Sequence, residues 1–197
     1  MRARTVVPLL ASLAALAAPA PSAARPAERP LVRSASGIVL VVGDSLAVGT
    51  EPFLAPLVAP RRVAWEARSG RTTPEGLLAL RAGLARVTPQ TVVISLGTND
   101  GPDPARFANR ISRVLAAVPL SACVVWATVI RPPRKGPYHA LNNVLRRTAR
   151  SDPRVVLVDW ARAVASGRVA LPDGVHPDRS GFRYRSRLLA AAVRRGC

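Results

Sequence analysis

A serine follows a short apolar segment at the point where a buried strand would end. Residues 38–42 read IVLVV, and Gly43, Asp44 and Ser45 come directly after them. An uninterrupted β-branched run is typical of a strand that is buried on both faces of a parallel sheet, so Ser45 would lie at the edge of a crevice. A serine hydroxyl is a poor nucleophile unless a neighbouring base takes its proton. The rest of the chain should therefore supply a base, an acid that orients it and donors for an oxyanion.

The two histidines of the chain, His139 and His176, are the candidates for this base. His176 follows Asp173 by three residues in the segment DGVHP. In a turn, this spacing lets the carboxylate meet one ring nitrogen while the other nitrogen faces outward, which fixes the tautomer and stabilises the imidazolium. His139 has no acidic neighbour in the sequence, and we interpret it as a surface or structural residue. The pattern predicts Ser45, His176 and Asp173 as the catalytic residues.

Three groups are candidates for the oxyanion hole: the backbone N–H of Ser45, the backbone N–H of Gly70 and the side-chain amide of Asn99. A glycine at position 70 would let the main chain approach the reacting centre without a Cβ in the way. Asn99 precedes Asp-Gly, which is ordinary turn chemistry, so it can also be a turn residue only. Asp44 is adjacent to Ser45 and should project in another direction, so we expect its carboxylate to brace neighbouring loops.

Five apolar segments alternate with amphipathic ones, which predicts a parallel sheet covered by helices on both faces. The expected strands are 38–42, 63–66, 91–96, 123–128 and 155–158. The expected helices are 46–58, 72 to about 84, 103–118, a helix through 141–145 and 180–195. In the usual strand order 2-1-3-4-5, the switch point lies between strands one and three. Ser45 follows the first of these and Asn99 the second, so both should border one crevice.

The N-terminal residues differ from the rest of the chain. Arg2 and Arg4 precede an uncharged stretch that begins at Thr5 and ends in Ser22-Ala23-Ala24. This layout predicts a signal peptide over residues 1–24, a Pro/Ala/Arg-rich linker over 25–36 and one catalytic domain over 37–197. The alternative is a retained membrane anchor, since the stretch is just long enough to cross a bilayer. Its prolines favour cleavage, which predicts a secreted or cell-envelope protein with no stable membrane insertion afterwards.

The chain contains two cysteines, Cys123 and Cys197. In an oxidising compartment an even pair can form a disulfide. The alternative is that Cys123 is a buried small apolar residue and Cys197 a free terminal thiol. Two cysteines and two histidines at these spacings make no zinc ligand set, so we expect no metal, and nothing in the sequence calls for an organic cofactor.

The formal net charge is +18, which attracts polyanions. We find no nucleic-acid recognition element, and the basic residues, nearly all arginine, are scattered, so nucleic acid is not an expected partner. The loop 131–135 follows the fourth strand and could overhang the crevice. We expect Arg131 and Arg134 to favour anionic substrates there; the alternative is a solvent-facing connection.

Four sequence blocks together resemble those of the SGNH (GDSL) hydrolase family. They are Gly-Asp-Ser-Leu at 43–46, Gly70, Gly-Thr-Asn-Asp at 97–100, and Asp173 with His176. The resemblance covers essentially the whole mature chain. It differs from the α/β-hydrolase pattern, because Ala47 stands where the second glycine of the Gly-x-Ser-x-Gly elbow would be.

The resemblance implies a flavodoxin-like, three-layer α/β/α fold and an acyl-serine mechanism. Ser45 would be the nucleophile, His176 the base and Asp173 its orienting acid, and Ser45, Gly70 and Asn99 would form the oxyanion hole. Segments 126–133, 142–145 and 158–160 are also similar to the extracellular domains of bacterial peptidoglycan O-acetyltransferases. Those domains normally follow a multi-pass membrane acyltransferase, which is not part of this sequence, so hydrolysis is the expected reaction.

The sequence therefore favours an exported serine esterase that cleaves short acyl groups, such as acetyl, from a carbohydrate or cell-wall polymer. Two alternatives stay open. One is transfer of the acyl group to a sugar hydroxyl through the same acyl-enzyme. The other is a noncatalytic basic module that binds an anionic polymer in the crevice.

Overall fold

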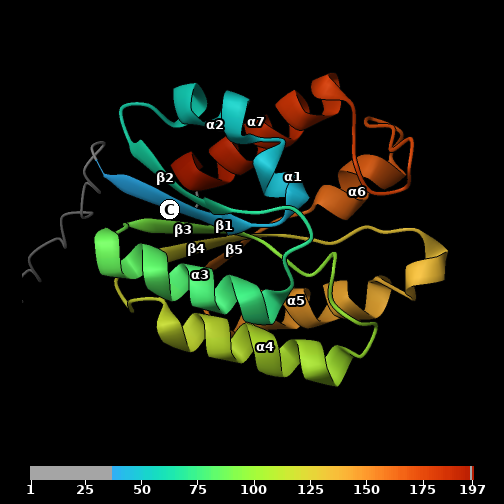
Figure 1. Cartoon of the computed structure of the whole chain (residues 1–197), viewed down its shortest axis with the longest axis horizontal. Coiled ribbons are helices and arrows are strands. Elements are labelled where there is room, and N and C mark those ends of the chain that lie inside the picture. Colours follow the sequence, from blue (N-terminus) through green and yellow to red (C-terminus); the bar gives the residue numbers. More distant parts are fainter. Residues whose placement is uncertain (1–36, 196) are drawn as a thin grey trace, which may run out of the picture. The chain divides into compact units, whose positions relative to one another are not determined.

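The computed structural model describes residues 37–195 and residue 197. The predicted signal peptide and linker, residues 1–36, lie outside them. The described chain folds around one five-stranded parallel sheet in the order β2-β1-β3-β4-β5, which confirms the order expected from the sequence (Figure 1). The strands are β1 (Ile38–Gly43), β2 (Arg62–Ala67), β3 (Thr91–Ser95), β4 (Cys123–Ala127) and β5 (Val155–Val158).

The three central strands carry the apolar runs and are almost entirely buried. Strand β1 pairs with β2 on one side and with β3 on the other, and Gly43 lies opposite Ser95 of β3. Beyond the paired residues, the backbone N–H of Asp44 donates to the carbonyl of Ser95 at 3.0 Å. This register brings the residues after β1 and those after β3 to the same edge of the sheet.

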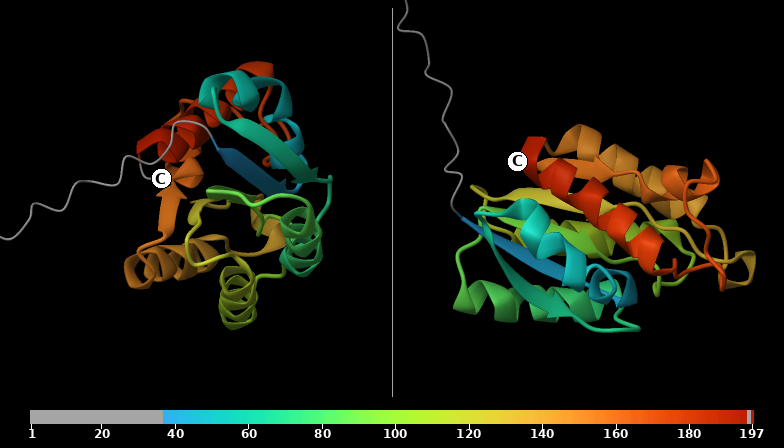
Figure 2. Two further views of the ribbon diagram at one scale, coloured as in Figure 1. Left: turned by 90° about the vertical axis from the view of Figure 1, so that its left-hand side faces the viewer. Right: turned by 90° about the horizontal axis from the view of Figure 1, so that it is seen from above.

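Helices cover both faces of the sheet, giving the three layers (Figure 1). They are α1 (Ser45–Val48), α2 (Glu51–Val58), α3 (Thr73–Arg86), α4 (Pro104–Ala117), α5 (His139–Ser151), α6 (Trp160–Ala165) and α7 (Arg179–Arg195), with a short 3-10 turn at Pro133–Lys135. Figure 2 shows α2 and α7 on one face and α3 and α4 on the other. Within residues 37–195, no helix is both long and apolar enough to cross a membrane.

Each face of the sheet has its own apolar core. Residues of α3, α4 and α5 pack on one face, for example Leu80, Phe107 and Leu141, each at most 1% exposed. Residues of α2 and α7, such as Leu54 and Leu189, pack on the other. Burial on both faces explains why the central strands read as continuous apolar runs without alternation.

The structure corrects two helix predictions. The expected helix 46–58 is divided into α1 and α2, because Pro52 has no N–H to continue the ladder and suits the first turn of a new helix. Gly49 lies at this break, where a Cβ would collide with the ring of Phe182 in α7. Helix α6 was not predicted. Its N-cap is Asp159, directly after β5, whose side chain accepts a hydrogen bond from the N–H of Arg162 at 3.2 Å.

A disulfide joins Cys123, the first residue of β4, to Cys197, with the Cα atoms 5.6 Å apart. The sequence left two alternatives open for these cysteines, and the structure contains the disulfide. It ties the end of the chain after α7 to the central sheet, across a sequence separation of 74 residues.

Removing this disulfide should lower stability. A loop of this size is worth about 4 kcal/mol in the chain-entropy model. The variant Cys197→Ser should therefore melt on the order of 10 °C below the oxidised protein in a calorimetric or circular dichroism scan. Reductant should lower the Tm of the wild type towards that of the variant and leave the variant unchanged. Equal melting temperatures in oxidised wild type and variant would contradict a stabilising role.

Candidate active site

Ser45 is the first residue of α1, immediately beyond β1. The carboxylate of Asp44 caps this short helix by accepting a hydrogen bond from the N–H of Leu46 at 3.0 Å. Gly43 lets α1 approach the sheet closely, because a Cβ there would collide with Ala47 and Ser95. The side chain of Asp44 is fully buried, whereas Ser45 remains partly exposed. The two neighbouring side chains thus have separate roles, as the sequence suggested.

The side chains of Ser45, His176 and Asp173 are linked in that order. The Ser45 Oγ lies 2.7 Å from His176 Nε2, and His176 Nδ1 lies 2.7 Å from Asp173 Oδ2. The serine and the histidine are 131 residues apart in the sequence. In this geometry Nδ1 can donate to the carboxylate while Nε2 accepts the proton of the hydroxyl.

The turn around Asp173 holds the histidine in place. Its Oδ1 accepts hydrogen bonds from the backbone N–H groups of Val175 at 2.9 Å and His176 at 2.7 Å. Gly174, which follows Asp173, has φ 78°, a left-handed conformation that favours glycine. The hydrogen bonds from the His176 ring and from the two N–H groups hold the pKa of Asp173 below its ordinary range. The acid therefore stays ionised and fixes the imidazole at both its backbone and its ring.

The site is open to solvent. The side chains of His176 and Asp173 are 42% and 56% exposed. The histidine and its acid are therefore not enclosed by the protein.

Gly70 and Asn99 reach this edge of the sheet through a shared neighbour, Arg71. The Asn99 Nδ2 donates to the carbonyl of Arg71 at 3.2 Å, and the Arg71 guanidinium donates to the carbonyl of Gly43 at 3.4 Å. Gly70 has φ 75°, and no atom lies within 4 Å of where its Cβ would be. The left-handed backbone conformation at position 70 therefore favours glycine.

Arg131 corrects a sequence prediction. We expected the loop 131–135 to present Arg131 to an anionic substrate or to solvent, but its side chain is only 2% exposed. Its guanidinium donates to the backbone carbonyls of Thr98, at 3.4 Å, and Asp100. These two carbonyls flank Asn99, so Arg131 holds the Asn99 loop against the protein. Arg134 remains exposed.

The side chain of Asp100 anchors the same loop from the other side. It is 5% exposed, and its Oδ2 accepts hydrogen bonds from the N–H of Thr73 at 3.0 Å and from its hydroxyl at 2.8 Å. Its Oδ1 pairs with Arg110 of α4. The contacts tie the Asn99 loop to the start of α3, which follows the Gly70 turn, so the two candidate oxyanion loops are held together.

Sequence reasoning missed a buried arginine near Asp44, the residue that precedes Ser45. Arg185 of α7 is 1% exposed, donates to the hydroxyl of Ser95 at 2.9 Å, and places its guanidinium 4.8 Å from the ring centre of Trp160. Its charge attracts the carboxylate of Asp44. The sequence carries one signal for the burial of Arg185. This arginine precedes the buried Leu189 by four residues, so the two side chains share one face of α7.

The buried Asp44 should make stability depend on pH. Burial raises its pKa from 3.8 to about 6, although Arg185 and the hydrogen bond from Leu46 oppose this shift. Because the unfolded chain ionises first, the free energy of unfolding should fall as the pH rises from about 4 to about 6, by on the order of 3 kcal/mol. Denaturant titrations across this pH range should show the fall in the wild type and its absence in Asp44→Asn. The control variant Asp103→Asn, at an exposed helix cap, should show the same fall in the free energy of unfolding as the wild type. If Asp44→Asn also showed this fall, a group other than Asp44 would be its cause.

Serine hydrolases use a hydroxyl, an imidazole and a carboxylate linked in this order. Here Ser45 follows β1, at the carboxyl edge of the sheet. Residues 41–184 match the model of the GDSL-like lipase/acylhydrolase family. The chain belongs to this family, which supports hydrolysis of ester bonds. No curated protein sequence matches the chain significantly.

Solved structures share the fold. Similar structures include TesA, with 28% identity, a TM-score of 0.63 and coverage of 80% of this chain and 96% of that chain. The lipase/acylhydrolase of Enterococcus faecalis has 18% identity, a TM-score of 0.71 and coverage of 79% and 94%. The C-terminal catalytic domain of peptidoglycan O-acetyltransferase A of Streptococcus pneumoniae has 20% identity, a TM-score of 0.64 and coverage of 81% and 90%.

Proposed function

We propose that this protein is an exported serine esterase that removes short acyl groups, such as acetyl, from a carbohydrate or cell-wall polymer through an acyl-serine intermediate. The observation that carries the proposal is the continuous contact from Ser45 Oγ through His176 to Asp173, with 2.7 Å at each of the two steps. Membership of an acylhydrolase family supports the same reaction type.

In the proposed mechanism, His176 Nε2 takes the proton of Ser45 as Oγ attacks the ester carbonyl. Asp173 stabilises the imidazolium that forms. The backbone N–H groups of Ser45 and Gly70 and the amide of Asn99 donate to the oxyanion. His176 then gives its proton to the departing alcohol, and water, activated by the same nitrogen, releases the acid from Ser45.

Two features support a large, extracytoplasmic substrate. The exposed His176 and Asp173 leave the reacting centre accessible to an acyl group carried on a polymer. The disulfide between Cys123 and Cys197 is of a kind that persists in oxidising compartments. The predicted signal peptide agrees with export.

Transfer of the acyl group is the second candidate. It uses the same acyl-enzyme and differs only in whether water or a sugar hydroxyl takes the acyl group. The openness of His176 favours neither acceptor.

One experiment separates the candidates. Purified protein is incubated with an activated aryl acetate, with and without an acceptor oligosaccharide, and released acetate and acetylated sugar are both quantified. An esterase releases acetate and forms no sugar ester, whereas a transferase forms sugar ester at the expense of acetate. Absence of any turnover and of any acyl adduct on Ser45 would leave a noncatalytic binding module as the conclusion.

Asn99→Ala tests the oxyanion hole. The loss of one preorganised donor should lower kcat by about 10²–10³, with little change in KM. Steady-state kinetics with the aryl acetate measure this. Asn143→Ala, which alters an exposed asparagine of α5, is the matched control and should leave kcat unchanged. If Asn99→Ala kept a normal kcat, Asn99 would not be an oxyanion donor, and its role would be the hydrogen bond to Arg71.

A further inference from the structure

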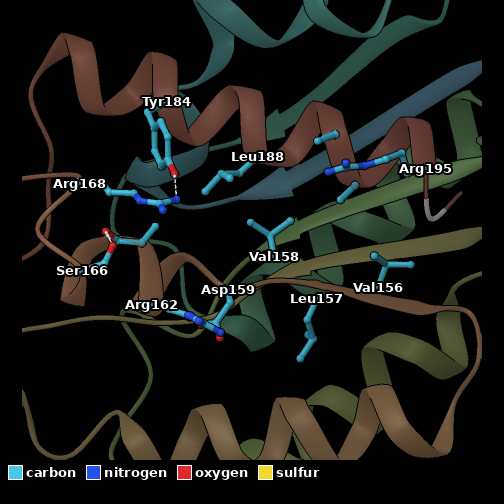
Figure 3. Close-up of a pocket in the computed structure, with 13 residues that line it drawn as sticks. Val156, Leu157, Val158, Asp159, Arg162, Ser166, Arg168, Tyr184, Leu188 and Arg195 are labelled. Atoms are coloured by element: carbon cyan, nitrogen blue, oxygen red, sulfur yellow. Dashed lines mark hydrogen bonds between the residues drawn. The ribbon is translucent and has the colours of Figure 1, made fainter.

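A groove lies along the edge of the sheet, at strand β5. It has a volume of about 630 Å³ and is lined by β5, by α6 and the segment after it, and by α7 (Figure 3). None of Ser45, Gly70, Asn99, Asp173 and His176 lines it. This β5 groove is therefore separate from the candidate active site.

The wall formed by β5 is a main-chain edge. Residues 156–159 all line the groove, although consecutive side chains of a strand point to opposite faces. Strand β5 pairs with β4 and, in the described part of the chain, with no other strand. On the outer side, the N–H of Val155 is bonded to Asp152 and the carbonyl of Asp159 to Ala163, which leaves the N–H and C=O of Leu157 between them. Open main-chain groups at an edge strand are the condition for adding a strand to a sheet.

The side chains around this edge are apolar in the middle and cationic at the ends. Val158 and Leu188 lie between Arg195 on one side and Arg162 and Arg168 on the other, and Val156 lies at the Arg195 end (Figure 3). The three arginines are exposed. Such a pattern suits an extended ligand that is apolar in the middle and negatively charged at both ends.

The one carboxylate of the groove does not neutralise these arginines. Asp159 is engaged by the hydroxyl of Thr128 at 3.1 Å and by Arg146 at 3.5 Å, and it caps α6. Of the three arginine side chains, Arg168 contacts the hydroxyl of Tyr184 at 3.3 Å. The groove therefore keeps an uncompensated positive charge, which attracts an acidic ligand.

The spacing of the charges matches a short extended peptide. Arg168 contacts Tyr184 of α7, so Tyr184 marks the position of Arg168 along this helix. Arg195 follows Tyr184 by eleven residues in α7, which corresponds to about 16 Å along the helix axis. An extended chain covers this length with about five residues. A single-headed lipid would leave one end of the groove unpaired, and a polysaccharide would not use the regular backbone edge of β5.

We propose that the β5 groove binds an acidic peptide segment in extended conformation, which pairs with β5 as a sixth strand and places its acidic residues against Arg195 at one end and Arg162 and Arg168 at the other. The proposal concerns a protein or peptide partner and is independent of the esterase reaction.

The test uses a fluorescein-labelled peptide, Glu-Val-Thr-Val-Glu, blocked at both ends, and fluorescence anisotropy with the purified protein. We expect binding that weakens as salt is added, and at least tenfold weaker binding of both Lys-Val-Thr-Val-Lys and Glu-Val-Pro-Val-Glu. The proline peptide keeps the charges but loses a backbone donor. In hydrogen exchange, the amides of β5 should become more protected when the acidic peptide is bound.

Charge reversal supplies the decisive variant. Arg162→Glu combined with Arg195→Glu should lose at least tenfold in affinity for the acidic peptide and gain affinity for the basic one, while esterase activity is unchanged. Arg113→Glu combined with Arg150→Glu, exposed arginines outside the groove, makes the same change in net charge and should not reverse the preference. Equal binding of the acidic, basic and proline peptides would overturn the proposal. Tighter binding of polygalacturonate or dodecyl phosphate than of the acidic peptide would replace the peptide by a polysaccharide or a lipid.

Discussion

Replacing Ser45 by alanine should lower kcat for an aryl acetate by on the order of 10⁶. The reason is that His176 Nε2, 2.7 Å from the serine Oγ, would then have no nucleophile to deprotonate. The reaction would fall back on water attack assisted by the remaining oxyanion donors. Initial rates, combined with the mass of the intact protein after incubation with the acyl donor, measure the loss and the missing acyl adduct together.

Ser112→Ala is the matched control for this variant, because Ser112 is an exposed serine of α4. It should keep full activity and still carry the adduct on Ser45. Turnover of Ser45→Ala at a rate near that of the wild type would remove Ser45 as the nucleophile and with it the proposed acyl-serine mechanism.

Asp173→Asn should lower kcat by on the order of 10⁴ while the protein stays folded. The carboxylate of Asp173 accepts from the His176 ring at Nδ1 and, through its other oxygen, from two backbone N–H groups. An asparagine can preserve the backbone contacts but can present its NH₂ to Nδ1. The ring proton would then move to Nε2, which could no longer accept the proton of Ser45. Steady-state kinetics and a melting curve measure activity and folding separately.

Asp178→Asn makes the matched comparison. Asp178 is an exposed aspartate at the start of α7, and it accepts hydrogen bonds from the N–H of Gly181 at 2.8 Å and from the hydroxyl of Ser180 at 2.7 Å. This variant should keep its kcat. If Asp173→Asn were as active as Asp178→Asn, the acid would have no part in orienting the base.

The fold could be predicted in some detail because its signals are local. The run at 38–42 and the segments at 91–96 and 123–128 are rich in β-branched residues, and the structure has strands within one residue of each of these ranges. Asp103 and Pro104 predicted the start of α4, because a capping carboxylate followed by a proline in the first turn is a local signal in adjacent residues. The strand order then followed from general rules of parallel sheets.

The candidate catalytic residues could be recognised for a related reason. Asp173 and His176 are three residues apart, so one turn suffices to bring their side chains together. Ser45, Gly70 and Asn99 each follow a predicted strand, and in a parallel sheet such positions share an edge. The break between α1 and α2 was less predictable, because it depends partly on the ring of Phe182, far away in the chain.

The sequence by itself determined the order of the strands, the edge at which the site forms and the residue types available there. The tertiary structure decided which charged side chains are buried and what they contact. Arg131 and Arg134 look alike in the sequence, yet the first holds carbonyls 31 and 33 residues away and the second is exposed. Burial of an arginine is stable only where distant carbonyl or carboxylate groups converge on it. That convergence is a property of packing between elements, and no local pattern of residues encodes it.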